Sequence, residues 1–327
     1  MGTGTRAGRW GGIARAAGGA CALALALALG GCALTTPSRS EVAAPEAQAT
    51  IDASALMEAG VLTVAVDTSD APQAMNGNDG APTGYYVDVA RALAQHFGLN
   101  VKIVSAASAH SALDSDEADL YIGSKPSDAS STVTVLGTVG EDASAVFVKA
   151  SDSSSTPSVS ASSLEGATIG VQSSSASQDA LKRAGISATQ KTYENVNKCF
   201  DALDAGEVSY VACDATAGGY LARAYPDIVF AGTIGSTSSY GIGVLKANDE
   251  LADAIKQACS DLADNGVFDA LHTAWYGNVP LSLTDTTVDG VTVAQSSGND
   301  SEESGTADGD RAVETDTPIT RDINSLG

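Results

Sequence analysis

The sequence predicts an α/β fold with two lobes. Two observations support this: strand-like segments alternate with segments that have an apolar helical face, and the alternation starts again about halfway along the core. The chain has 327 residues, of which 43% are hydrophobic. This is enough for one large domain or two small ones with a sizeable core.

The first half of the core opens with a strand predicted at 62–66, where Leu and Val alternate with smaller residues. A helix is predicted over 87–97, because its apolar residues share one face and Gly98 ends it. Two further strands are predicted at 101–104 and 118–122. This order of elements indicates an α/β sheet.

The pattern then restarts with a second series of elements and returns to helices at its end. Ligands of open α/β sheets bind at the carboxyl ends of strands, and in two lobes these ends can face one cleft. The predicted strands are 145–149, 167–171 and 208–213, and the predicted helices are 178–184, 196–203, 216–224, 251–262 and 267–275.

The N-terminus has the pattern of an export signal. Residues 1–31 contain three arginines and no acid before an apolar run at 20–29, which is too short for a comfortable membrane span. The following Leu-Gly-Gly-Cys, ending at Cys32, resembles a bacterial lipobox, which implies cleavage before Cys32 and a diacylglycerol on its thiol. The alternative is an ordinary secretory signal with a chance cysteine.

Both ends of the core are flanked by polar sequence. Residues 32–55 are polar and Ala-rich with two prolines, and we expect a flexible tether there. Residues 279–327 lose periodicity and are acidic, so a disordered tail is predicted. An Asp-Gly pair within 286–293 is a weak hairpin signal.

Charge and motifs exclude several classes of protein. With 40 acidic and 17 basic residues, the net charge is −23, which argues against a nucleic-acid partner and against docking on anionic lipid by charge. The three histidines are dispersed, so no metal site is expected. The sequence contains no Walker loop, HExxH or CxxC motif, and no cofactor is predicted.

Five stretches in the core resemble, in order and spacing, the bacterial extracellular solute-binding proteins of family 3. The resemblance implies a two-lobed periplasmic-binding-protein-like class II fold over 56–278 and the role of receptor subunit for an ABC importer. The stretches are 60–66 (GVLTVAV), 84–90 (GYYVDVA), 113–122 (LDSDEADLYI), 164–171 (LEGATIGV), and DNG at 264–266 with WYG at 275–277.

The resemblance also implies a domain layout. Lobe one comprises 56–142 and 240–278, lobe two comprises 143–239, and two hinge segments lie near 140–144 and 233–239. A small polar solute, an amino acid or an amine-containing compound, binds between the lobes. The expected partners are ABC permease subunits and the membrane, through the lipid on Cys32. The expected location is the extracellular face of the cytoplasmic membrane. The protein is expected to be a monomer and not an enzyme.

The expected pocket departs from the family pattern at the ligand carboxylate. Family members often place an arginine where this chain has Ser131, so we expect Ser124 and Lys125, in the same stretch, to contact the ligand. Ser174 and Ser175 stand where the family has a Gly-Thr pair at a helix start. An exposed loop lysine and simple helix capping are the alternatives.

Three further residues complete the predicted pocket. Asp214 matches the position that holds the ligand ammonium, with a helix N-cap as the alternative. Asp70 stands where relatives place an aromatic residue, which favours a basic or amine-containing solute over glutamate. Tyr85 is one of the nearest aromatics, and either it or Tyr86 is expected to reach the cleft.

Cysteine pairing and function each leave alternatives. Cys199 on a helix and Cys213 on the next strand are predicted to form a disulfide, which an exported location permits. The alternative functions on the same fold are a sensor or adhesin without transport, and a cyclohexadienyl dehydratase-like enzyme.

Overall fold

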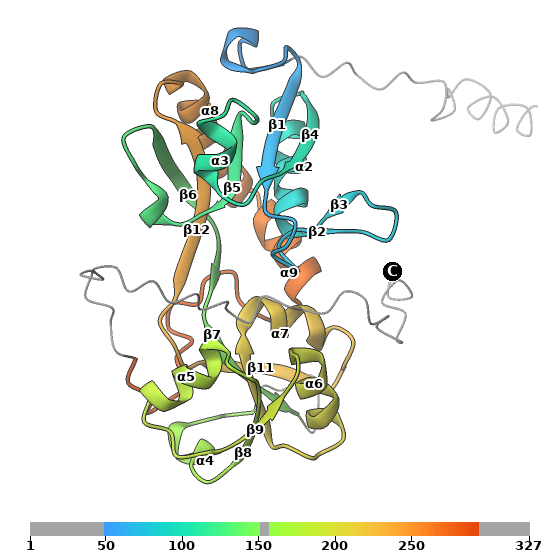
Figure 1. Cartoon of the computed structure of the whole chain (residues 1–327), viewed down its shortest axis with the longest axis vertical. Helices are drawn as coiled ribbons and strands as arrows, with labels where there is room; N and C mark the ends of the chain where they lie inside the picture. Colours follow the sequence, from blue (N-terminus) through green and yellow to red (C-terminus); the bar gives the residue numbers. More distant parts are fainter. Residues whose placement is uncertain (1–48, 151–156, 294–327) are drawn as a thin grey trace, which may run out of the picture. The chain divides into compact units, whose positions relative to one another are not determined.

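The computed structural model describes residues 49–150 and 157–293, which form two five-stranded sheets with helices packed on them. This arrangement confirms the predicted α/β class with two lobes (Figure 1). Cys32 and the predicted signal at 1–31 lie outside the described residues. Within the described ranges, no helix is both long and apolar enough to cross a membrane.

The first sheet has the strand order β4-β1-β5-β12-β6. β1 is parallel to its neighbours β4 and β5, and β12, which lies between β5 and the edge strand β6, is antiparallel to both. The strands are β1 (Val61–Val66), β4 (Asn100–Ser105), β5 (Leu120–Ser124), β6 (Val133–Asp142) and β12 (Ser238–Leu245). The elements packed around them are η1 (Ala53–Ala55), the hairpin β2 (Met75–Asn76) and β3 (Pro82–Thr83), α2 (Tyr85–His96), α3 (Ala109–Leu113), η2 (Pro126–Asp128), α8 (Asp249–Asp264) and α9 (Val267–Tyr276). We call this part the first lobe.

The second sheet has the order β11-β7-β10-β8-β9 and is also mixed, with β7 antiparallel to both neighbours. Its strands are β7 (Ser144–Lys149), β8 (Thr168–Gln172), β9 (Thr189–Tyr193), β10 (Tyr210–Asp214) and β11 (Ile228–Thr233). Its helices are α4 (Ala161–Leu164), α5 (Ala176–Arg183), α6 (Val196–Asp204) and α7 (Ala215–Ala222). We call this part the second lobe.

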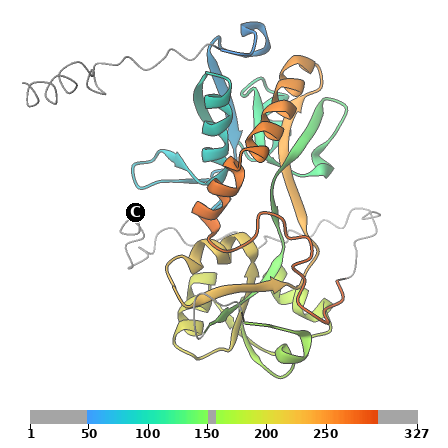
Figure 2. The same ribbon diagram turned by 180° about the vertical axis from the view of Figure 1, so that it is seen from behind.

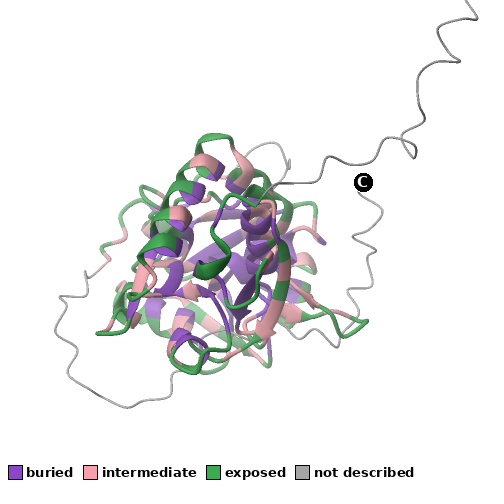
Figure 3. Ribbon diagram, turned by 90° about the horizontal axis from the view of Figure 1, so that it is seen from above, coloured by how far each residue is buried: buried purple, intermediate pink, exposed green. Residues whose placement is uncertain are grey.

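The pattern of burial explains why these strands form. Five of the six residues of β1 are buried, as expected for a central parallel strand covered on both faces. The apolar face of α2 is likewise buried, with Val89 and Leu93 fully covered. Buried residues, purple in Figure 3, gather in the interior, and exposed residues, green, lie mainly on the outside. Gly84 starts this helix at φ 133°, where a Cβ would lie 2.4 Å from the carbonyl oxygen of Gln73. The glycine therefore lets the loop that carries Gln73 lie directly against α2.

The chain passes between the lobes three times. β6 leads into β7 through Ala143, and β11 leads back into β12 through residues 234–237. After α9 the chain enters the second lobe again along residues 279–293, which we call the C-terminal strap (Figure 2). The strap is bonded to the end of β11, where the Thr233 N–H donates to Thr286 O at 2.9 Å and the Val288 N–H donates to Thr233 O at 2.9 Å.

Both predicted flexible ends need correction where they meet the core. Ile51 and Ala55, in the expected tether, are buried, and the Thr50 N–H donates to Phe97 O at 3.1 Å. Val279, Leu283 and Val288, in the expected tail, are buried as well. Apolar side chains therefore anchor 49–55 and the strap, whereas the rest of both predicted segments lies outside the described residues.

The predicted disulfide between Cys199 and Cys213 is also corrected, because both residues are thiols in the structure. The Cys199 Sγ donates to the carbonyl oxygen of Asn195 at 3.4 Å, one turn back along α6. The Cys213 Sγ points toward α7, where it would lie 2.8 Å from a Cβ added at Gly218.

Candidate functional site

A cavity of about 280 Å³ lies between the two lobes. Its walls are the segments that follow β1, β5, β8 and β10, together with the connections between the lobes. The carboxyl ends of these strands are where open α/β sheets bind ligands. The residues that line it are Asp70, Ala71, Gln73, Lys125, Asp142, Ala143, Ser144, Ala176, Arg183, Asp214, Thr216, Ala217, Gly235, Ser236, Ser238 and Tyr240.

The structure brings three of the seven predicted ligand contacts to this cavity. Asp70 comes from the loop after β1, Lys125 follows β5, and Asp214 ends β10 and precedes α7. The Asp214 carboxylate makes no capping hydrogen bond to α7, so the capping alternative does not account for it. The Lys125 Nζ lies 5.9 Å from the centroid of the Tyr240 ring.

The other four predicted contacts do not line the cavity. Tyr85 is buried and its hydroxyl donates to Val139 O. Ser124 is fully buried, and its Oγ would lie 2.6 Å from a Cβ added at Gly243. Ser175 caps α5, accepting from the Gln178 N–H at 3.1 Å, and Ser174 is an exposed turn residue at φ 62°. The residues of α5 that line the cavity are its first and last, Ala176 and Arg183.

Arg183 is a cavity residue that the sequence analysis missed. It is the last residue of α5, seven positions after Ala176, and therefore about two turns further along the same helical face. The spacing of seven residues between Arg183 and the start of α5 is the sequence signal that could have identified this residue. No carboxylate lies within 4.0 Å of its guanidinium among the described residues.

A hydrogen-bonded chain joins the two lobes beside the cavity. The Gln73 Nε2, from the first lobe, donates to Thr216 Oγ1 at 2.9 Å, and Thr216 Oγ1 donates to Asp142 Oδ2 at 2.7 Å. The backbone N–H of Thr216 also donates to Asp142 Oδ1 at 3.1 Å. Thr216 lies at the start of α7, so its hydrogen bonds join this helix to two parts of the first lobe, the loop of Gln73 and the end of β6.

Asp142 is held in surroundings that disfavour its charge. Burial raises the pKa of its carboxyl to about 6, and the nearby negative charge of Asp70 acts in the same direction. The hydrogen bonds from Thr216 and from the Ala143 N–H lower the pKa but do not offset the burial. The cavity therefore contains a carboxyl group that gains a proton in mildly acidic solution.

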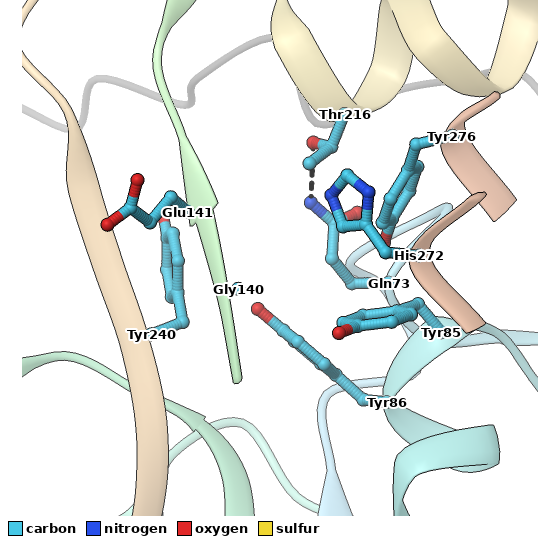
Figure 4. A pocket seen from close by; sticks show the side chains of 9 residues that line it. All are labelled: Gln73, Tyr85, Tyr86, Gly140, Glu141, Thr216, Tyr240, His272 and Tyr276. Carbon is cyan, nitrogen blue, oxygen red and sulfur yellow. Dashed lines mark hydrogen bonds between the residues drawn. The ribbon is translucent and has the colours of Figure 1, made fainter. Parts of the chain in front are cut away.

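A second, much smaller cavity of about 10 Å³ adjoins the first one and shares Gln73, Thr216 and Tyr240 with it (Figure 4). Tyr85 and Tyr86 of α2 and His272 and Tyr276 of α9 form its aromatic wall. Burial lowers the pKa of His272 to about 4, so its ring is neutral at pH 7. This volume is about that of one water molecule, so the small cavity is too small for a solute.

α7 and α9 close the space behind these cavities. The rings of Tyr220 and Trp275 stack at 6.0 Å between centroids, with an angle of 19° between their planes. A Cβ added at Gly219 would lie 2.7 Å from Tyr276 O. The absence of a side chain at this position lets the two helices pack closely across the lobes.

The large cavity therefore combines cations, carboxylates and hydroxyls from both lobes. Lys125 and Arg183 are suited to an anionic group, and Asp70 and Asp214 to a cationic one. Such a lining fits a small solute that carries charges of both signs.

Comparisons with known proteins agree with this geometry. The family model of the bacterial extracellular solute-binding proteins, family 3, matches residues 62–278. The L-cystine-binding protein TcyJ of Escherichia coli (strain K12) is 24% identical over 231 residues, which cover 67% of this chain and 84% of that protein.

Two solved structures show the same fold. The L-cystine solute receptor of Neisseria gonorrhoeae, in its unliganded open conformation, has a TM-score of 0.57 and 18% identity over 68% of this chain and 95% of that one. The ancestral cationic amino acid solute binding protein AncCDT-1 has a TM-score of 0.55 and 21% identity over 66% of this chain and 96% of that one. These likenesses confirm the class II fold that the sequence resemblance implies.

Proposed function

This chain belongs to the bacterial extracellular solute-binding proteins, family 3, and we propose that it captures a small polar amino acid in the cavity between its lobes. One observation carries the proposal: the cavity of about 280 Å³ is lined by charged residues from both lobes. A ligand that contacts the lining residues of both lobes stabilises the conformation in which the lobes enclose it.

The lining favours an amino acid with an additional amine over an acidic one. Asp70, Asp142 and Asp214 line the cavity together with Lys125 and Arg183, so carboxylates outnumber cations there. Glutamate would bring two carboxylates into this lining, which costs electrostatic free energy. The Escherichia coli relative TcyJ is an L-cystine-binding protein, which makes L-cystine the first ligand to test.

The proposed role includes delivery to an ABC permease by a lipid-anchored, monomeric receptor on the extracellular face of the cytoplasmic membrane. The signal-like residues 1–31 and the lipobox-like sequence ending at Cys32 support export and anchoring. We also propose that the protein is a receptor and not an enzyme, because the similar proteins described above are binding proteins or receptors.

A thermal-shift and calorimetry screen of residues 33–327 against amino acids, polyamines, short peptides and sugars tests the ligand class. A ligand at 100 times its Kd should stabilise the protein by about 2.7 kcal/mol. We expect amine-containing amino acids to raise the melting temperature more than glutamate does. Glutamate binding as well as they do would contradict the preference, and a screen without any amino-acid binding would contradict the receptor role.

Matched variants locate the site. Asp214→Asn removes a cavity carboxylate and should weaken binding of the best amino acid by roughly 10- to 100-fold, the range for a hydrogen bond to a charged group. Asp253→Asn removes an exposed carboxylate that pairs with Lys256 on α8, and it should leave the affinity unchanged. Equal affinities for the two variants would place the ligand elsewhere.

A further inference from the structure

Three polar atoms meet at the small cavity beside the contact between the lobes. Gln73 Oε1, His272 Nε2 and Tyr276 OH are buried, and none of them has a hydrogen-bond partner in the described parts of the chain. Their residues all line the cavity of about 10 Å³ and are only 9%, 2% and 1% exposed (Figure 4). Burying a polar atom without a partner costs free energy, so three such atoms at one cavity point to a ligand that pairs with them.

The hydrogen bonds between the lobes fix the orientation of the Gln73 amide. Asp142 has a pKa of about 6 and is mainly ionised at pH 7, so the single hydroxyl hydrogen of Thr216 lies on the bond to Asp142 Oδ2. The Thr216 oxygen then only accepts from Gln73, whose Nε2 lies at 2.9 Å. Turning the amide over would place two acceptors against each other, so Gln73 Oε1 is the atom left for the small cavity.

Aromatic packing holds the two groups of α9 in place. His272 and Tyr276 lie one helical turn apart, and their ring centroids are 4.9 Å from each other. The Tyr85 ring packs against both, with centroid distances of 5.8 Å to His272 and 5.3 Å to Tyr276. The Tyr85 hydroxyl donates to Val139 O, so it is engaged elsewhere.

The size and chemistry of the cavity match one water molecule. A volume of about 10 Å³ is what one water requires, and a water needs two to four polar partners. One water can donate to Gln73 Oε1 and accept from the Tyr276 O–H, and its remaining hydrogen and lone pair suit His272 Nε2 in either tautomer. The three groups are uncharged at pH 7, since the pKa of His272 is about 4 and burial raises the pKa of Tyr276, and this suits a neutral ligand.

We propose that the small cavity binds one water molecule, which bridges Gln73 Oε1, His272 Nε2 and Tyr276 OH. The water extends the hydrogen-bonded chain of Asp142, Thr216 and Gln73 to α9. It holds the amide of Gln73 with its Nε2 toward Thr216 and so supports the contact between the lobes. Gln73 and Thr216 also line the large cavity, but the inference does not depend on which solute binds there.

A high-resolution crystal structure of residues 33–327, without added solute, tests for the water directly. We expect one ordered water at about 2.5–3.2 Å from each of Gln73 Oε1, His272 Nε2 and Tyr276 OH. A small cavity without ordered density would overturn the inference. A structure in which the Gln73 amide or the His272 ring has turned onto a partner in the protein would overturn it as well.

Two Tyr→Phe variants in the same aromatic wall test the site in solution. If a water pairs with the Tyr276 hydroxyl, Tyr276→Phe removes a hydrogen bond and should lower the melting temperature by about 2–4 °C. If the hydroxyl has no partner, its removal relieves a buried unpaired group, and the melting temperature should stay the same or rise. Tyr85→Phe is the matched control and should lower the melting temperature in either case, because its hydroxyl donates directly to Val139 O. A decrease for Tyr85→Phe without one for Tyr276→Phe would overturn the inference.

Discussion

The Asp142 carboxyl group is part of the contact between the lobes, so its protonation is linked to that contact. Its carboxylate accepts two hydrogen bonds from Thr216, which in turn accepts one from Gln73 of the first lobe. Because burial raises the pKa of this group to about 6, the folded protein binds the proton more tightly than the unfolded chain, in which an Asp has a pKa of about 3.9.

The sign of the pH dependence follows from this difference. The contribution of Asp142 to the free energy of unfolding is fully present below about pH 4 and is lost as the pH rises through about 6, amounting to about 2–3 kcal/mol. Urea unfolding of the ligand-free protein at pH 4 and at pH 7 measures it. The variant Asp142→Asn should lose this part of the pH dependence.

Asp253→Asn, on the exposed face of α8, is the matched control and should keep the pH dependence of the unchanged protein. If Asp142→Asn and the unchanged protein differed equally in stability at the two pH values, the proton would be bound elsewhere. Asp119, whose pKa burial also raises, would then be the next carboxyl group to examine.

Individual residues of the cavity lining were predictable where a strand end places them. Asp70, Lys125 and Asp214 each follow or end a strand whose pattern is visible in the sequence, and all three line the cavity. Arg183 lies two helical turns from the nearest strand end, and only the helix direction brings it there. The cysteine prediction was wrong, because the packing of α6 on β10 does not by itself imply a bond between Cys199 and Cys213.

At the scale of elements, α7 depends on residues without side chains. A Cβ added at Gly218 would lie 2.2 Å from Phe147 Cε2, in the core of the second lobe. Gly218→Ala should lower the free energy of unfolding by about 1–3 kcal/mol, the usual cost of overpacking, in spite of the higher helix propensity of alanine. Chemical denaturation followed by circular dichroism measures the change.

Gly170 of β8 is the matched control, because a Cβ there would meet its nearest neighbour at 3.4 Å, an ordinary contact distance. Gly170→Ala should therefore change stability much less than Gly218→Ala. If both variants were equally stable, Phe147 would have to move aside at little cost, and close packing of α7 on β7 would not be essential.

The elements with clear periodicity were predictable, and the polar ones were not. The strands predicted at 62–66, 101–104, 145–149 and 167–171 correspond to β1, β4, β7 and β8. The strands β6, β9, β11 and β12 were not predicted. Polar residues or glycines interrupt the apolar pattern of β9 and β12, whereas β6 begins with VTVL and β11 with IVFA, local signals that the sequence analysis did not use. They form through pairing with neighbours distant in sequence, which local patterns do not reveal.

At the scale of the whole described part, the C-terminal strap is a third connection between the lobes. Its composition is that of a polar tail, and its three buried residues, Val279, Leu283 and Val288, at spacings of four and five, are too few to establish a helical or strand period. The predicted hairpin within it is replaced by pairing with the second lobe, through the bridges of Thr287 to Thr233 and of Asp289 to Ser160. Long-range pairing of this kind had no local signal in the sequence.

The strap is bonded to both of the other connections. The Glu141 Oε2, on β6 beside Asp142, accepts from the Leu283 N–H at 2.7 Å and from the Ser282 Oγ at 3.3 Å. At the end of β11, Thr233 exchanges backbone hydrogen bonds with the strap, and Gly232 leaves room for Val288 there. A change in the angle between the lobes would therefore have to strain or break contacts of the strap.

Two truncations test this role. Ending the chain after Val293 keeps the strap, and it should leave both the stability and the amino-acid affinity unchanged. Ending it after Asn278 exposes the sites of three buried apolar side chains, each worth roughly 1.5–3 kcal/mol before the entropy of the strap is subtracted, so the melting temperature should fall by several degrees. Because the hinge also loses the bonds at Glu141, the affinity for the ligand should change as well. Glu141→Gln separates the two effects, because it weakens these hydrogen bonds but keeps the buried side chains. A change in ligand affinity with little change in melting temperature would support a role of the strap in the hinge. An unchanged affinity in both Glu141→Gln and the chain that ends after Asn278 would mean that the strap only covers the second lobe.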